Sequence, residues 1–130
     1  MAKILVADDS ATEVTFLQEI LKDTNHEILI ATNGLEAEKL ARTTPVDLII
    51  LDVVMPEKNG FQVCRALKKD PKFSHIPIII TTSKSGESDK FWGMKQGADE
   101  YITKPFEPVD ILLAVKKHLE IGRASGRERV

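Results

Sequence analysis

The sequence lacks several features that would direct it to an oxidising compartment, a membrane or a nucleic acid. It has one cysteine in 130 residues, so no disulfide can form within the chain. No apolar run approaches the roughly 20 residues that span a bilayer, and the start, MAKILVADD, turns acidic too early for a signal peptide. The formal charge of −2 gives no electrostatic basis for gripping nucleic acid or an anionic membrane. We therefore expect a soluble, cytoplasmic protein with no nucleic-acid or membrane contact.

Features that would indicate certain bound groups are also missing. The sequence has no cluster of cysteine and histidine, which disfavours zinc, and we assign no role to the scattered His26, His75 and His118. The stretch Asp8–Thr12 lacks the glycines that let a backbone cradle phosphates, and it carries repelling charge. This disfavours a flavin- or nucleotide-binding protein. Cys64 occupies an apolar position of a helical pattern, so we expect a small buried side chain rather than a reactive thiol.

Short apolar runs alternate with amphipathic segments along the chain. The composition, 42% hydrophobic and 29% charged, fits one domain with one sizeable core. Five strands are predicted at Lys3–Ala7, Glu27–Ala31, Val46–Leu51, Ile76–Thr81 and Glu100–Thr103. The first, third and fourth are almost continuous isoleucine, leucine and valine, a composition typical of strands covered on both faces. The pattern predicts an α/β fold: a doubly wound, five-stranded parallel sheet with five helices.

Helices are indicated by capping signals and by apolar spacing. Ser10 and Glu13 fit a capping box, and Asn33 precedes Glu36 in a similar pattern. Three sets of apolar residues then recur at helical spacing: Val14, Leu17, Ile20 and Leu21; Phe61, Cys64 and Leu67; Ile111, Leu112, Val115 and Leu119.

The end of the chain is polar, basic and contains glycine. The last helix is predicted to stop at Gly122. We therefore expect residues 1–121 to form the domain. Residues 122–130 would be a flexible tail, the start of a linker or a remnant of cloning.

Polar side chains follow the predicted strands at their carboxyl ends. Asp8 and Asp9 follow the first strand, Asp52 the third, Thr82 the fourth and Lys104 the fifth. Ligands of an open α/β sheet bind at this edge. Three carboxylates placed together repel one another, so either some stay protonated or a cation lies among them. Carboxylate oxygens are the ligands that Mg²⁺ prefers, which predicts a magnesium site.

Asp52 is the one acidic residue within Leu48–Pro56, a run that is otherwise apolar or proline. We expect its backbone to be buried and its side chain to enter the acidic site, where a carboxylate can attack phosphorus. Lys104 adds a mobile positive charge, and Thr82 adds a short hydroxyl donor. These groups suit phosphoryl transfer, which requires positioning and charge neutralisation. The predicted product is an aspartyl phosphate.

At these residues the sequence resembles the receiver domains of two-component response regulators, over about residues 3–120. The resemblance rests on segments that occur in the family's order: Ala7–Ser10, Leu51–Pro56 with Asn59–Gly60, Ile80–Ser83, Gly97–Tyr101 and Lys104–Phe106. The chain looks most like the CheY-like single-domain members. Its stretch Asp89–Gly97 is similar to the PilG and PilH regulators of type IV pilus motility. The resemblance implies a flavodoxin-like fold with strand order 2-1-3-4-5.

The resemblance also implies a role for each acidic residue. Asp52 would be the phosphoacceptor and would contribute to the Mg²⁺ site. Asp9 would bind the ion directly, and Asp8 largely through water. The main-chain carbonyl of Val54 would complete the protein's share of the ligands.

Three further residues take their expected roles from the same resemblance. Lys104, joined to Pro105 by a cis bond, would pair with the phosphoryl oxygens. Thr82 would be the switch hydroxyl, and Tyr101 the aromatic residue that turns inward when Thr82 moves. Ser83 departs from the commonest pattern, because alanine or glycine is usual at its position. Lys84 and Val54 occupy positions that vary in the family and help to set how long the phosphate survives.

As a member of this family, the chain would be a signalling module rather than an enzyme with a separate substrate. It would catalyse its own phosphoryl transfer and a slow autodephosphorylation. A histidine kinase or a phosphotransfer protein would donate the phosphate. A downstream protein would read the face made by the fourth helix, fifth strand and fifth helix, in motility or chemotaxis-type signalling. We expect a monomer.

Simpler interpretations exist for each residue. Either aspartate after the first strand could cap the helix that follows. Lys104 could belong to an ordinary turn, and Thr82 could simply end a strand. Tyr101 is by default a half-buried aromatic at a sheet edge, and Trp92 is expected to pack inside. Among functions, an aspartyl-nucleophile phosphatase and a phosphorylation-independent interaction module remain alternatives, although 130 residues leave no room for a phosphatase cap domain.

Overall fold

A computed structural model describes residues 1–128, and within the last helix it describes side chains as far as Ile121. The strands are β1 Lys3–Ala7, β2 Glu27–Ala31, β3 Leu48–Leu51, β4 Ile78–Thr82 and β5 Glu100–Thr103. The helices are α1 Ala11–Leu21, the short 3₁₀ helix η1 Lys22–Thr24, α2 Gly34–Thr43, α3 Gly60–Lys69, α4 Glu87–Lys95 and α5 Pro108–Glu128. The described residues contain no helix with the length and apolar character needed to cross a bilayer.

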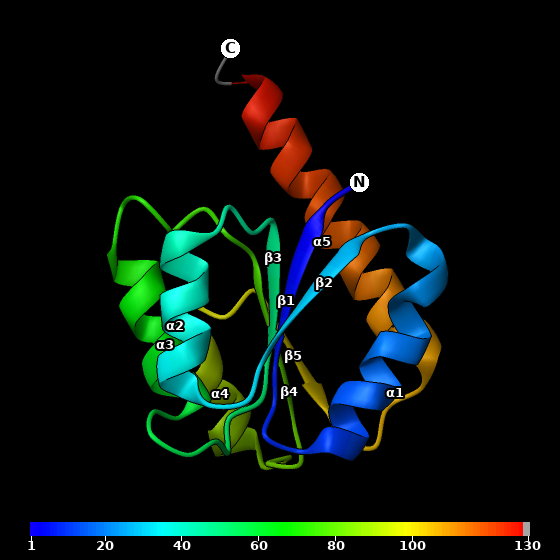
Figure 1. Cartoon of the computed structure of the whole chain (residues 1–130). Coiled ribbons are helices and arrows are strands. Elements are labelled where there is room, and N and C mark those ends of the chain that lie inside the picture. Colours follow the sequence, from blue (N-terminus) through cyan, green and yellow to red (C-terminus); the bar gives the residue numbers. More distant parts are fainter. Residues whose placement is uncertain (129–130) are drawn as a thin grey trace.

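The strands form one parallel sheet in the order β2-β1-β3-β4-β5. Helices α1 and α5 cover one face of this sheet, and α2, α3 and α4 cover the other (Figure 1). The α/β fold, the parallel sheet and the strand order predicted from the sequence and its resemblance are therefore confirmed. Because every strand runs the same way, all five carboxyl ends meet along one edge.

The bounds of the strands differ from prediction only in the middle of the sheet. β3 begins two residues later than predicted. The Asp47 N–H donates to the Lys3 carbonyl at 2.8 Å, but the Lys3 N–H donates to the Asp47 carboxylate, also at 2.8 Å. A side chain therefore takes the Lys3 N–H at the start of β3. β4 also begins two residues later and ends one residue later, at Thr82. Pro77 has no N–H to donate, and its carbonyl only accepts from Ile49 at 3.0 Å. Asp8, Asp9, Asp52 and Lys104 thus follow their strands at the predicted edge, and Thr82 is the last residue of β4.

The central strands are buried on both faces, as predicted from their composition. Leu5, Leu51 and Ile80 belong to the core on the α2–α3 side. Their neighbours in sequence that belong to the core on the α1–α5 side are Ile4, Val6, Ile50 and Ile79. Fully burying one such side chain stabilises the fold by about 1.5–3 kcal/mol. This packing fixes the positions at which the strands end.

The helix caps are only partly as predicted. Ser10 Oγ accepts the Glu13 N–H at 3.3 Å, but the Ser10 N–H donates to Asp8 Oδ1 at 2.9 Å rather than to Glu13. The capping box of α1 is therefore half formed. A reciprocal box occurs instead at the start of α3, between Asn59 and Gln62.

Two expectations about packing and one about helix length are wrong. Trp92 is 50% exposed, because α4 approaches the sheet through Gly93, where a Cβ would lie 2.8 Å from the Tyr101 ring. Leu112, which the helical spacing grouped with Ile111, Val115 and Leu119, is also exposed, whereas those three residues are buried. Helix α5 continues through Gly122 to Glu128. The domain limit at residue 121 and the nature of the segment after it stay predictions, and residues 129–130 lie outside the described part of the chain.

Candidate functional site

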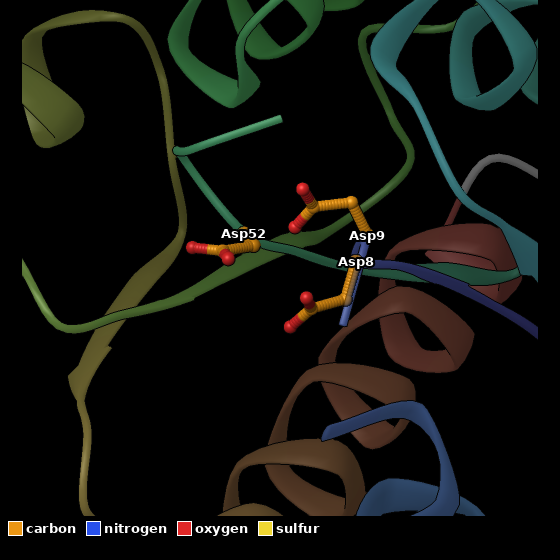
Figure 2. Close-up of side chains that lie close together, drawn as sticks. All are labelled: Asp8, Asp9 and Asp52. Atoms are coloured by element: carbon orange, nitrogen blue, oxygen red, sulfur yellow. The ribbon is translucent and has the colours of Figure 1, made fainter. Parts of the chain in front are cut away.

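Three aspartates come together at the carboxyl edge of the sheet. Asp8 and Asp9 follow β1, and Asp52 follows β3, the strand beside it. The Asp52 N–H donates to the Ala7 carbonyl at 2.9 Å, which continues the pairing of the two strands to their ends. One carboxylate oxygen from each aspartate lies within 4.8 Å of the others, and Figure 2 shows the three side chains gathered at one place.

This acidic group has the composition of a site for a hard cation. Asp8 and Asp52 are buried, whereas Asp9 is exposed, so water reaches one side of the group. Mg²⁺ takes carboxylate oxygens and retains several waters, and no histidine or cysteine of the described residues joins the group. Val54 lies two residues after Asp52 in the loop from β3 to α3, with its side chain exposed. Its role as a carbonyl ligand stays a prediction.

Lys104 reaches the same group from the end of β5. Its Nζ lies 3.0 Å from Asp8 Oδ2, 3.5 Å from Asp52 Oδ2 and 3.8 Å from Glu13 Oε2. The bond from Lys104 to Pro105 is cis, as the resemblance implied. Burial alone lowers the pKa of Lys104, but its hydrogen bond to Asp8 and the surrounding carboxylate charges outweigh burial and raise it. The lysine therefore carries its full charge at neutral pH.

Asp52 is held in surroundings that disfavour its negative charge. Burial raises the pKa of its carboxyl, and the charge of Asp8 acts in the same direction. The charge of Lys104 and hydrogen bonds from Thr82 and from the Val53 N–H, at 2.7 Å, lower the pKa, but the net shift is upward. A further positive charge beside Asp52 would favour its ionised, nucleophilic form.

Thr82 and Tyr101 meet at the main chain of Lys84. Thr82 is fully buried and accepts the Lys84 N–H at 3.4 Å through Oγ1, and its hydroxyl acts to lower the pKa of Asp52. Tyr101 is 9% exposed, more buried than a half-buried edge residue, and donates its hydroxyl to the Lys84 carbonyl at 2.6 Å. Burial raises the pKa of Tyr101 to about 12, so it remains a donor at neutral pH. One peptide segment therefore connects the two side chains.

The loop after Asp52 is held close to the strand end by a glycine. The Gly60 N–H donates to the Val53 carbonyl at 2.8 Å. A Cβ on Gly60 would lie only 2.1 Å from the Asp52 carbonyl oxygen, so a larger residue would push the loop away. The Asn59–Gly60 pair of the sequence motif thus combines a helix cap with a close backbone approach.

Sequence reasoning missed two participants. Glu13 was interpreted only as a capping residue, yet its carboxylate faces Lys104. Lys84 was predicted to occupy a variable position that helps to set phosphate lifetime, but its backbone also joins Thr82 to Tyr101. Every residue except proline has both a backbone N–H and a carbonyl, so no side-chain pattern marks the second role. Cys64 is fully buried, as expected, and burial raises the pKa of its thiol to about 12.

Comparison with known proteins places this geometry in a family. The model of the response regulator receiver domain matches residues 4–116. Protein PilH of Pseudomonas aeruginosa is 45% identical over 115 residues, which cover 88% of this chain and 95% of PilH. Several other relatives are longer, and the chain spans less than half of their length.

Solved structures agree. The receiver domain of a signal transduction histidine kinase from Syntrophus aciditrophicus is 38% identical with a TM-score of 0.86, covering 92% of this chain and 91% of that one. The chemotaxis protein CheY4 of Vibrio cholerae is 32% identical with a TM-score of 0.82, covering 90% of this chain and 98% of its own. The resemblance noted from the sequence is therefore confirmed.

Proposed function

Because the chain belongs to the family of response regulator receiver domains, we propose that Asp52 accepts a phosphoryl group from a histidine kinase or a phosphotransfer protein. Receiver domains are signalling modules of two-component systems rather than classical enzymes. The observation that carries the proposal is the meeting of Asp8, Asp9, Asp52 and Lys104 at one edge of the sheet.

Asp52 acts as the nucleophile. A carboxylate oxygen attacks phosphorus, an O–P bond forms, and the P–N bond of the donor's phosphohistidine breaks, with the electron pair leaving on the imidazole nitrogen. Burial and the hydrogen bond from the Val53 N–H hold the carboxyl group in place. Because burial also raises the pKa of Asp52, the reactive anion depends on nearby positive charge.

Asp8, Asp9 and Asp52 would hold Mg²⁺, with Asp9 binding directly, Asp8 largely through water and the Val54 carbonyl as a further ligand. When bound, the ion neutralises charge on the phosphoryl oxygens and on the carboxylates. Lys104 supplies a second positive charge from the other side. It already lies within 4 Å of Asp52 and needs only a small movement to reach an oxygen attached there.

The switch would begin at Thr82, whose hydroxyl already acts on the pKa of Asp52. A phosphoryl group adds strong acceptor oxygens, which draw the Thr82 hydroxyl and with it the backbone of Lys84. Tyr101 is bonded to that backbone and therefore responds. Tyr101 also lines a hollow of about 420 Å³ between β5 and α5, together with Pro105, Leu113 and others. A partner protein would read this face, made by α4, β5 and α5.

The biological setting follows from the relatives. PilH matches over almost its full length, and the Vibrio neighbour is a chemotaxis protein. The proposed role is therefore chemotaxis-type or motility signalling by a cytoplasmic, monomeric regulator. Its signal would end by slow autodephosphorylation.

Incubation with acetyl phosphate and Mg²⁺, followed by intact-mass measurement, tests the proposal. Wild type should gain one phosphoryl group, Asp52→Asn none, and Asp9→Asn much less because the cation binds poorly. Asp23→Asn is the matched control, since this aspartate is exposed in η1 and should leave the adduct unchanged. A wild type without adduct, or an equal adduct on Asp52→Asn, would contradict the proposal.

A pull-down from lysate with and without beryllofluoride addresses the output. Partners retained only with beryllofluoride fit a phosphorylation switch. Partner binding that is the same for wild type and Asp52→Asn would favour the phosphorylation-independent interaction module instead.

A further inference from the structure

Lys104 has a carboxylate neighbour that does not belong to the acidic group. Glu13 Oε2, from the first turn of α1, lies 3.8 Å from Lys104 Nζ. The carboxylate oxygens that gather within 4.8 Å of one another come from Asp8, Asp9 and Asp52, and not from Glu13. Glu13 therefore faces the lysine rather than the candidate cation position.

The local structure explains why Glu13 is free to do this. A glutamate at the third position of a helix ordinarily bonds back to the N–H of the capping residue. Here the Ser10 N–H donates to Asp8 Oδ1 at 2.9 Å. The Glu13 carboxylate is thus displaced from its usual partner and is directed to Lys104.

An aromatic contact keeps α1 beside the segment that carries Lys104. Phe16, one turn after Glu13, stacks on Phe106 with ring centroids 5.6 Å apart and an angle of 22° between the rings. Phe106 follows Lys104 by two residues and packs against the core on the α1–α5 side. The two contacts, one charged and one aromatic, lie on the same side of α1.

We propose that Glu13 is a positioning residue that retains Lys104 among the resting carboxylates and opposes its transfer to phosphoryl oxygens on Asp52. The inference rests on the proposed function of Asp52. Lys104 is a single positive charge facing three carboxylates, and a phosphoryl group adds about 1.5–2 negative charges at the same place. Glu13 both attracts the lysine and repels the new oxygens. Its charge therefore sets how readily the domain is activated.

Beryllofluoride, which mimics the phosphoryl group on an aspartate, provides the test. Its affinity is measured by calorimetry at saturating Mg²⁺, so that any change in cation binding does not contribute. Glu13→Gln should bind beryllofluoride about threefold to tenfold more tightly than wild type, the scale of one charge pair near a partly solvated surface. The Glu13 side chain is 32% exposed, so salt screens the interaction, and the gain should shrink as sodium chloride is raised.

Glu19→Gln is the matched control. It removes the same charge from the same helix, but Glu19 is exposed and pairs with Lys22 at 3.2 Å. Its beryllofluoride affinity should stay within about twofold of wild type. Glutamine at position 13 leaves the hydrogen bond from the backbone N–H of that residue to Ser10 Oγ intact. Thermal unfolding checks that both variants are folded.

A gain in affinity is a readout that damage to α1 would not produce, because a loosened helix would weaken the site. Glu13→Gln binding that equals the Glu19→Gln control, or binding weaker than wild type, would overturn the inference while leaving the role of Asp52 intact. A wild type that binds no beryllofluoride would instead overturn the proposed function, and the inference with it.

Discussion

Two lysines of similar burial lie at opposite ends of the sheet and have different surroundings. Lys68, near the amino ends of β4 and β5, donates to Asp99 Oδ2 at 2.8 Å and to the carbonyls of Ile76 and Ser74 at 2.8 and 3.2 Å. Lys104, at the carboxyl ends, faces three carboxylates. Their side chains are 16% and 15% exposed, so burial does not separate them.

The difference lies in charge balance. At the amino end, one ammonium meets one carboxylate, and its remaining donors are satisfied by carbonyls. At the carboxyl end, one ammonium is shared among Asp8, Asp52 and Glu13, with Asp9 close by. The first arrangement is complete and stabilises the fold. The second leaves negative charge without a partner and is ready for a cation and for chemistry.

Substituting Lys104 should produce the largest effect. Lys104→Met keeps most of the apolar stem of the side chain but removes the charge that the proposed mechanism uses, so phosphorylation by acetyl phosphate should slow about 100-fold. The rate is measured by intact mass at saturating Mg²⁺, which compensates the added repulsion among the carboxylates. A rate near that of wild type would show that Lys104 is as structural as Lys68.

Substituting Lys68 should give the opposite result. Lys68→Met preserves the aliphatic stem, which packs closely against Gly97. A Cβ added to Gly97 would lie only 2.8 Å from Lys68 Cγ. It removes the donor of the Ser74 and Ile76 carbonyls and leaves the Asp99 carboxylate with the Ile78 N–H but no ammonium partner, so the free energy of unfolding should fall by about 2–3 kcal/mol in urea denaturation. Phosphorylation should proceed at the wild-type rate. Recovery of stability by Mg²⁺ would contradict the contrast between the two ends.

The smallest effect should come from Asp52 in the absence of Mg²⁺. Because its pKa is raised in the folded state, the folded protein binds this proton more tightly than the unfolded chain. Stability is therefore lost as the pH rises from the ordinary value of 3.8 through the raised pKa. The free energy of unfolding of Asp52→Asn should be about 1 kcal/mol higher than that of wild type at pH 7. The difference should vanish below pH 3.8, where the carboxyl group is neutral in both states.

Urea denaturation at several pH values measures this difference. Asp99→Asn serves as the comparison at the amino end. It removes a carboxylate that is already paired with Lys68, so it should lower stability. A destabilised Asp52→Asn would show that the carboxyl end is balanced after all.

Much of the fold could be predicted because its signals are local. β1, β2 and β5 have the predicted bounds, since their apolar runs are interrupted at both ends by polar residues. β4 was misplaced at its start because Ile76 continues the apolar run, although Pro77 separates it from the ladder. The prediction that Trp92 packs inside was wrong because the packing of α4 depends on another element. Gly93 of α4 lies close to Tyr101 of β5, and this contact decides which side of the helix faces the sheet.

For the site, sequence patterns were sufficient to predict which residues reach the carboxyl edge. Asp8, Asp9, Asp52 and Lys104 follow their strands and Thr82 ends β4, and parallel strands end along one edge.

The partner that each side chain takes depends on the folded arrangement. Glu13 turns to Lys104 because Asp8, brought near by the same turn, already occupies the Ser10 N–H. Tyr101 bonds the backbone of Lys84, which no side-chain pattern identifies. Strand positions follow from the periodicity of neighbouring residues, whereas the choice of partner depends on competition among groups that only folding brings together.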